Sequence, residues 1–367
     1  MTSSFDVIIV GGGAVGAACA RELARERRRV LVLDRPDAEG VAWRAAAGML
    51  APQIESDRNE SLYELGVASR DRYAELAAEL RDATGIDIGF WREGIARVAF
   101  DEIDASGLKA AVAWQRQQGH RCDWLDADEV RNQWPWLRTP VGALWSPQDG
   151  ALDPVSLVNA LLADAVQHGA VLLRQTVRRV ERDGDRAVAV VADDRFSADD
   201  IIIAGGAWSG RIEGLPRPLS VEPVRGQMAA FAWPSDTPRA ILYHHHGYVL
   251  ARGDEALIGS TMEYAGFDSS VTESGQQRIW SSVRELCPPV GARPEIRSWA
   301  GLRPVTPDGL PIVGPAPDLS HLWYATGHGR NGILLAAITA VLLQQMIRGE
   351  PVHEHVKVMD PSRMWIW

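Results

Sequence analysis

The sequence is poor in cysteine and has no excess of positive charge, and each shortage excludes a class of protein. The three cysteines, Cys19, Cys122 and Cys287, are far apart, odd in number and lack metal-ligand spacing. A disulfide framework is therefore excluded, and a reducing cytoplasm fits best. The formal net charge is -10, from 38 Lys and Arg against 48 Asp and Glu. This balance argues against binding to nucleic acid or to an anionic membrane surface.

Long apolar runs are also scarce. The run Ile333–Leu343 is too short to span a bilayer and is followed by Gln344 and Gln345, so it predicts a buried helix. The N-terminus carries Asp6 and no basic region, so we expect no signal peptide. The chain of 367 residues, 46% of them hydrophobic, is long enough for two domains.

The N-terminus carries a phosphate-binding pattern. The apolar run Phe5–Val10 predicts a buried parallel strand, and Gly11, Gly13 and Gly16 follow it as G-x-G-x-x-G at the start of a predicted helix. The next predicted strand ends in Asp34, which can accept a hydrogen bond from a ribose hydroxyl. Strand, helix and spaced acid together predict dinucleotide binding. The pattern leaves FAD and NAD open. Arg35 could suit a 2′-phosphate, but Asp34 would repel one.

The middle of the chain contributes further elements to the same domain. Asp153 and Pro154 open a predicted helix, and Val177–Arg182 with Ala187–Ala192 predicts a hairpin. Ile201–Ala204 predicts a strand that runs into two glycines. Those glycines indicate either an ordinary tight turn or a second close approach to the cofactor.

Two inserts differ in composition, being rich in Trp, Pro and Thr with strand-like runs. We predict an α/β protein (α+β overall). Its Rossmann-type cofactor domain is discontinuous and comprises residues 1–85, 150–219 and 299–367. An antiparallel-sheet substrate domain with flanking helices comprises residues 86–149 and 220–298.

Three further segments carry a family resemblance. They read AAAGMLAP (Ala45–Pro52), WAGLRPVTPDGLPIVG (Trp299–Gly314) and GHGRNGILLA (Gly327–Ala336). With the N-terminal loop they resemble the D-amino-acid oxidase family of flavoproteins over essentially the whole chain. Within it they look most like the glycine oxidases that serve thiazole synthesis for thiamine. The resemblance implies FAD and a homo-oligomer, a tetramer or dimer. The cytoplasmic location, and the expectation of no nucleic-acid or membrane partner, come from the cysteines and the charge balance given above.

The resemblance also implies where FAD lies. The helix that opens at Asn331–Gly332 directs its N–H groups at the flavin pyrimidine ring, where negative charge develops, although Asn331 also suits a plain helix N-cap. Sarcosine oxidases, a neighbouring branch, attach FAD to a cysteine near the GLRP segment. Because residues 300–303 contain none, we expect non-covalent FAD. The predicted cofactor contacts are Gly11, Gly13, Ala14, Val15, Gly16, Asp34, Arg35, Ala46, Ala47, Gly48, Met49, Val177, Ala204, Gly205, Gly301, His328, Gly329, Arg330, Asn331, Gly332 and Ile333.

The substrate site follows from the same resemblance. Arg303 matches the arginine that binds the substrate carboxylate through two parallel bonds, and Tyr248 matches the tyrosine that adds a third. Taken without the family, Tyr248 is an ordinary strand residue. Arg330 matches an arginine near the site, although an arginine can also form a surface ion pair.

Further pocket residues are predicted. Met49 and Met262 match pocket positions, although methionine more often fills a core. We assign His246 to the mouth of the site. His244–His246 is not a metal site, because adjacent strand residues point to opposite faces.

The implied reaction transfers hydride from the α-carbon of glycine, sarcosine or a small D-amino acid to FAD. It releases an imine that gives glyoxylate and ammonia, or that enters thiazole synthesis, and molecular oxygen becomes hydrogen peroxide. Two alternatives remain open at this stage. One is a D-amino-acid dehydrogenase that passes electrons to a quinone, and the other is a dinucleotide-binding protein without turnover.

Overall fold

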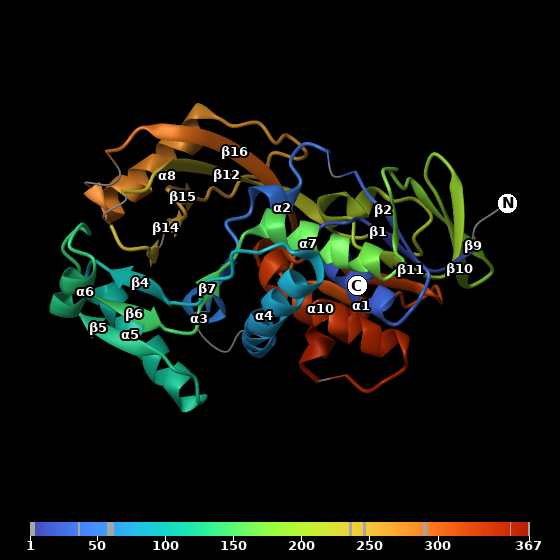
Figure 1. The fold of residues 1–367 in the computed structure, drawn as a ribbon, viewed down its shortest axis with the longest axis horizontal. Helices are drawn as coiled ribbons and strands as arrows, with labels where there is room; N and C mark the ends of the chain where they lie inside the picture. The colour runs from blue at the N-terminus through green and yellow to red at the C-terminus, as the bar shows by residue number, and fades with distance from the viewer. Residues whose placement is uncertain are drawn as a thin grey trace.

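Two sheets organise the molecule (Figure 1). The computed structural model describes residues 4–35, 37–56, 62–234, 237–244, 247–288, 292–352 and 354–365. The first sheet has eight strands in the order β17-β18-β11-β1-β2-β8, with β10 on β11 and β9 on β10. These strands are β1 (Ser4–Val10), β2 (Val30–Leu33), β8 (Val171–Leu173), β9 (Arg179–Asp183), β10 (Arg186–Val191), β11 (Arg195–Ile203), β17 (Ile312–Pro315) and β18 (Leu322–Thr326).

Alternating side chains of β1 give the first sheet two buried faces. Val7 and Ile9 pack beneath helices, whereas Ile8 and Val10 join a second apolar cluster with the β9–β10 hairpin. A parallel strand covered on both faces must be apolar along its whole length, which explains the unbroken run in the sequence. Figure 1 shows the covering helices on one side of this sheet. They are α1 (Ala14–Arg25), α4 (Tyr63–Thr84), α7 (Pro154–Gln167) and α10 (Gly332–Ile347).

The sequence predictions for this half are confirmed. The first strand, the helix after the glycine pattern, the hairpin and the strand before Gly205 all occur within a few residues of the expected positions. Asp153 caps α7 by accepting a hydrogen bond from the Ser156 N–H at 2.7 Å, and Pro154 occupies the first turn.

The second sheet also has eight strands, in the order β16-β12-β15-β14-β13-β4-β6-β5. Its pairings are antiparallel except that of β4 with β13, which is parallel. The predicted antiparallel-sheet domain is therefore confirmed with one exception. The strands β4 and β13 come from different inserts, so no hairpin dictates their direction. Its strands are β4 (Ile95–Ala99), β5 (Asp123–Asp126), β6 (Gly142–Ser146), β12 (Glu222–Ala232), β13 (Ile241–His244), β14 (Gly247–Arg252), β15 (Glu255–Gly259) and β16 (Glu295–Val305).

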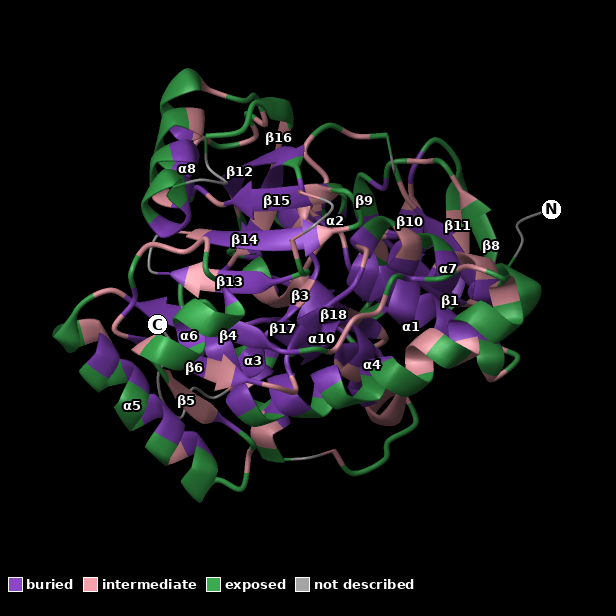
Figure 2. Ribbon diagram, turned by 60° about the vertical axis from the view of Figure 1, so that its left-hand side comes forward, coloured by how far each residue is buried: buried purple, intermediate pink, exposed green. Residues whose placement is uncertain are grey.

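Shorter elements flank the second sheet and join the two halves. Figure 2 shows green outer faces on the flanking helices and purple strands beneath them. The predicted domain boundaries stay a prediction, and β16 runs through the one at residue 299. The remaining elements are α2 (Ala42–Ala45), β3 (Met49–Leu50), α3 (Pro52–Glu55), α5 (Glu102–Gln117), α6 (Ala127–Gln133), β7 (Gly150–Ala151), η1 (Gly206–Arg211), α8 (Glu273–Leu286), η2 (Gly329–Asn331), η3 (Glu354–Met359) and η4 (Pro361–Trp365).

Helix α10 is the apolar helix near the C-terminus. Within the described residues, Gly329–Ile347 is long and apolar enough to cross a membrane by length and composition alone. However, α10 packs against α1 and α4, and its middle is buried, as Figure 2 shows. A core helix passes the same test, and the predicted buried helix is confirmed.

Candidate active site

A cavity of about 2180 Å³ is lined by strand ends and loops from both sheets. Pockets that bind drug-sized ligands have volumes of roughly 300–1,000 Å³, so this larger cavity can hold a dinucleotide together with a small substrate. All predicted site residues that the structure describes line it except Gly16. His246 lies outside the described residues.

The turn after β1 forms one end of the cavity. Gly13 is the N-cap of α1, makes no side-chain cap, and is followed by a first turn without an acidic residue. The helix N–H groups and the positive end of its dipole are thus suited to a phosphate. Gly16 lies behind this turn. A Cβ there would be 1.9 Å from the Gly11 carbonyl oxygen, so its role is close packing of helix against strand.

Asp34 follows β2 and faces the same end of the cavity. Burial raises the pKa of its carboxyl, whereas hydrogen bonds from the backbone N–H groups of Gly12 and Arg35 act in the opposite direction. A carboxylate that lies beside the glycine turn, at the end of the second strand, can accept a hydrogen bond from a ribose hydroxyl.

The other end of the cavity is formed by η2 and the start of α10. Asn331 occupies the N-cap position, but its side chain makes no cap hydrogen bond, and no acid lies in the first turn. Asn331 therefore stands at the N-cap without capping the helix through its side chain. The backbone N–H groups of the first turn of α10 are suited to binding a negative charge. His328 is buried beneath this turn with Nε2 3.1 Å from Thr339 Oγ1, and burial lowers its pKa to about 3. It is neutral at ordinary pH.

Arg303 projects from β16 into the cavity. Its Nη2 donates to Ser260 Oγ at 2.8 Å, and its Nη1 donates to the Thr261 carbonyl oxygen at 3.1 Å. The guanidinium lies over Gly226 of β12, where a Cβ would come 1.9 Å from Nη1. Burial lowers the pKa of Arg303, but an arginine still carries its charge.

Tyr248 projects from β14 into the same part of the cavity and is buried. Its hydroxyl donates to Met228 Sδ at 3.1 Å. Burial raises the pKa of this phenol, so Tyr248 remains a hydrogen-bond donor. Arg303 and Tyr248 thus offer guanidinium and hydroxyl hydrogens to one small anionic group.

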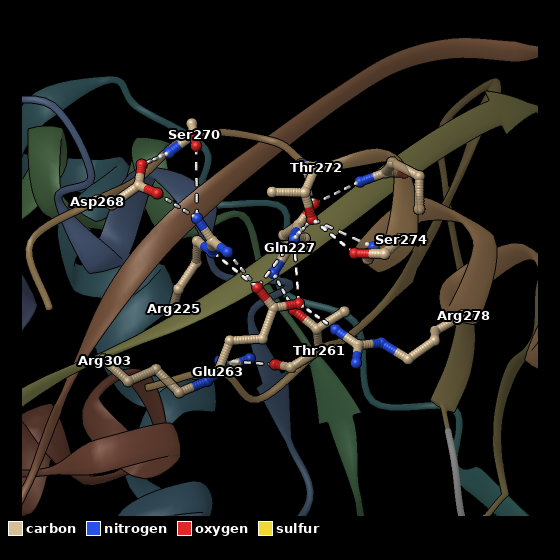
Figure 3. A network of polar contacts seen from close by, with 12 residues as sticks. Arg225, Gln227, Thr261, Glu263, Asp268, Ser270, Thr272, Ser274, Arg278 and Arg303 are labelled. Carbon is tan, nitrogen blue, oxygen red and sulfur yellow. Dashed lines mark hydrogen bonds and ion pairs between the residues drawn. The ribbon is translucent and has the colours of Figure 1, made fainter. Parts of the chain in front are cut away.

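A polar cluster beside Arg303 holds the segment that Arg303 contacts, Ser260–Thr261, in place (Figure 3). Glu263 accepts hydrogen bonds from Arg225 at 2.7 Å, from Gln227 at 3.1 Å and from Arg278 at 2.5 Å. Burial raises the pKa of Glu263, but the hydrogen bonds from Arg225 and Gln227 outweigh it and hold that pKa below its usual value. The Gln227 N–H also donates to Thr261 Oγ1 at 2.9 Å. The Ser260–Thr261 segment is thereby held against Arg303.

Sequence reasoning missed several residues at this site. Ser260 lies two residues before Met262, but nothing in the sequence there points to Arg303. Gly226 lies inside the strand β12, and a glycine in a strand can indicate that another group approaches the backbone closely, so the sequence could have pointed to it. Glu55, at the end of α3, lines the cavity and carried no sequence signal. Met262 is 65% exposed and lies at the rim, which excludes the core-filling role.

The fold and the cavity define an oxidoreductase built around a dinucleotide cofactor. The chain belongs to the family described as FAD dependent oxidoreductase (DAO), whose profile matches residues 6–346. FAD is therefore the cofactor, and the chain is an FAD-dependent amine oxidoreductase that acts on amino acids. The residues fit FAD, because the start of α1 suits the phosphates, Asp34 a ribose hydroxyl and the start of α10 the flavin.

Known proteins resemble this chain along its whole length. Glycine oxidase of Geobacillus kaustophilus is 35% identical over 353 residues, covering 95% of this chain and 94% of that protein. The crystal structure of glycine oxidase from that organism superposes with a TM-score of 0.92 at 32% identity, covering 99% of each chain.

Two more distant likenesses bear on substrate and partner. Iminodiacetate oxidase from Chelativorans sp. BNC1 is 26% identical with a TM-score of 0.89, covering 97% of this chain and 98% of that one. The bifunctional protein ThiO/ThiG of Synechocystis sp. is 34% identical over 99% of this chain, which spans only 54% of the bifunctional protein.

Proposed function

We propose that this protein oxidises glycine, and also small secondary or D-amino acids such as sarcosine and D-alanine, using molecular oxygen. The observation that carries the proposal is the pairing of Arg303 with Tyr248 in the cavity that also contains the dinucleotide turn. When bound, FAD accepts a hydride from the substrate α-carbon and passes the electrons on to oxygen. The names of the glycine oxidase relatives support this choice of substrate.

The residues of the chain bind and orient the substrate. Arg303 holds the carboxylate through two parallel bonds and Tyr248 adds a third, which fixes the direction of the α-carbon. Because the substrate enters with a neutral amine, no side chain has to act as a base. The imine leaves and either hydrolyses to glyoxylate and ammonia or passes to thiazole synthesis.

A second part of the proposal concerns the product. In the bifunctional relative, a region like this chain is joined to a second region of similar size. We infer that the imine formed here supplies thiazole synthesis for thiamine, in a cytoplasmic homo-oligomer. Size-exclusion chromatography tests the oligomer, and glycine-dependent thiazole formation with added thiazole synthase tests the pathway.

The deciding experiment is a visible spectrum of the purified protein, taken before and after glycine is added without oxygen. Bleaching of the flavin bands, with recovery and hydrogen peroxide when air is admitted, is expected. Bleaching by D-alanine with little peroxide would instead favour a dehydrogenase that uses a quinone. The Arg303→Ala variant should retain FAD and lose the response to glycine, and normal bleaching in that variant would reject the carboxylate assignment.

A further inference from the structure

Glu55 and Arg330 form an ion pair that lines the substrate end of the cavity. Arg330, in η2, directs Nε at Glu55 Oε2 across 3.4 Å, and its Nη2 donates to the Glu55 backbone carbonyl oxygen at 3.3 Å. Both residues line the cavity, and the Glu55 side chain is 17% exposed against 48% for Arg330. The pair joins the end of α3 to η2, the turn that leads into α10.

The pair lies within electrostatic reach of Arg303. After burial and Tyr248, the charges that act on the Arg303 pKa are Glu55, which raises it, and Arg330, which lowers it. Among the described residues, Arg303, Arg330 and Glu55 thus place two cations and one anion within electrostatic reach of one another. Arg303 is directed at the substrate, whereas the charge of Arg330 is matched by Glu55.

We propose that Glu55 is a specificity-determining residue that restricts the site to amines with one carboxylate by occupying Arg330. This inference rests on the proposed function, since it takes the carboxylate on Arg303 as given.

The physical reason is competition for one guanidinium. An amine with two carboxylates would place one on Arg303 and bring the other towards Arg330, whose charge acts on Arg303. With Glu55 in place, the second carboxylate must displace an existing partner and also lies beside a like charge. A substrate with one carboxylate meets neither cost. Glu55 would thus select against dicarboxylates by repulsion, while Arg303 attracts the single carboxylate of the preferred substrate.

The test uses inert ligands of matched length. Glutarate has the chain length of iminodiacetate and carries two carboxylates, whereas butyrate has that of sarcosine and carries one. Dissociation constants for both are measured on the FAD-loaded protein from the change in its visible spectrum. In Glu55→Gln we expect the affinity for glutarate relative to butyrate to rise about tenfold, a modest value because Arg330 is half exposed.

Three further variants make the outcome specific. Glu55→Gln combined with Arg330→Gln should lose the gain. Arg330→Gln alone should give no gain and should lower the ratio, because it removes the cation that offsets the Glu55 charge beside the second carboxylate. Glu285→Gln removes a charge at the α8 part of the cavity, where Glu285 pairs with Arg138 at 3.1 Å, and should not change the ratio. An unchanged ratio in Glu55→Gln, or a gain that survives loss of Arg330, overturns the inference.

Turnover separates this inference from the proposed function. Flavin reduction by sarcosine and by iminodiacetate is compared in the same variants, and the iminodiacetate rate should rise in Glu55→Gln relative to sarcosine. If glycine and sarcosine fail to reduce wild-type flavin, the proposed function falls while the ligand ratio still tests Glu55. If they reduce it and the ratio does not move, only the role of Glu55 falls.

Discussion

The hydroxyl of Tyr248 donates its hydrogen bond to the sulfur of Met228, 3.1 Å away. A thioether is a weak acceptor, so the hydroxyl loses little by turning to a carboxylate held on Arg303. Tyr248→Phe keeps the ring and removes this bond. We expect KM for glycine to rise at least about tenfold, because a hydrogen bond to a charged group contributes roughly 1.5–3 kcal/mol, with less effect on kcat.

Steady-state kinetics at several glycine concentrations measure this change. Tyr264→Phe is the matched control, since Tyr264 is 75% exposed and should leave KM unaltered. Equal KM values for Tyr248→Phe and wild type would remove Tyr248 from the site.

Gly226 provides a second prediction, about Arg303. A Cβ on Gly226 would meet the three guanidinium atoms at 1.9 to 2.4 Å, and these are the far end of a flexible side chain rather than backbone. Gly226→Ala should therefore displace Arg303 while the sheet stands. We expect kcat/KM for glycine to fall at least tenfold, with FAD content and Tm close to those of wild type.

Gly107→Ala is the control for this substitution, because a Cβ on Gly107 of α5 would meet nothing within 4 Å. Unchanged kinetics in Gly226→Ala would show that the guanidinium does not need its position over β12.

The cofactor half could be predicted from sequence because its signals are local. Gly11, Gly13 and Asp34 follow one strand and the next at spacings that the geometry of a βαβ unit dictates. Glu55 and Arg330 are 275 positions apart, and no local pattern joins them. The path of the Arg303 side chain over Gly226 depends on side-chain packing between strands, which strand periodicity does not specify. The parallel pair β4–β13 was missed for the same reason, because the sequence predicts strands more readily than their partners.

The cysteines provide a prediction about cofactor attachment. Cys19, Cys122 and Cys287 are all buried, and none lines the cavity. Burial also raises the pKa of Cys19 and Cys122 to about 12, which leaves little reactive thiolate. Heat or acid denaturation followed by ultrafiltration should release all the flavin into the filtrate. Flavin colour retained on the precipitated chain would contradict non-covalent binding.

His328 makes stability depend on pH in a defined direction. Burial lowers its pKa to about 3 in the folded protein, against the ordinary value of 6.5. Between these values the unfolded chain binds a proton that the folded protein does not, so stability rises with pH across this window and is lost as pH falls through it. The loss approaches about 1.4 kcal/mol for each pH unit.

His328→Gln removes the titration, so its Tm should fall less steeply than that of wild type from pH 6.5 to 4. The Tm of both proteins is measured from melting curves with excess FAD. The difference in Tm at pH 8 gives the effect of the substitution that does not depend on the titration. Parallel Tm curves for the two proteins would show that His328 does not titrate on unfolding in this range.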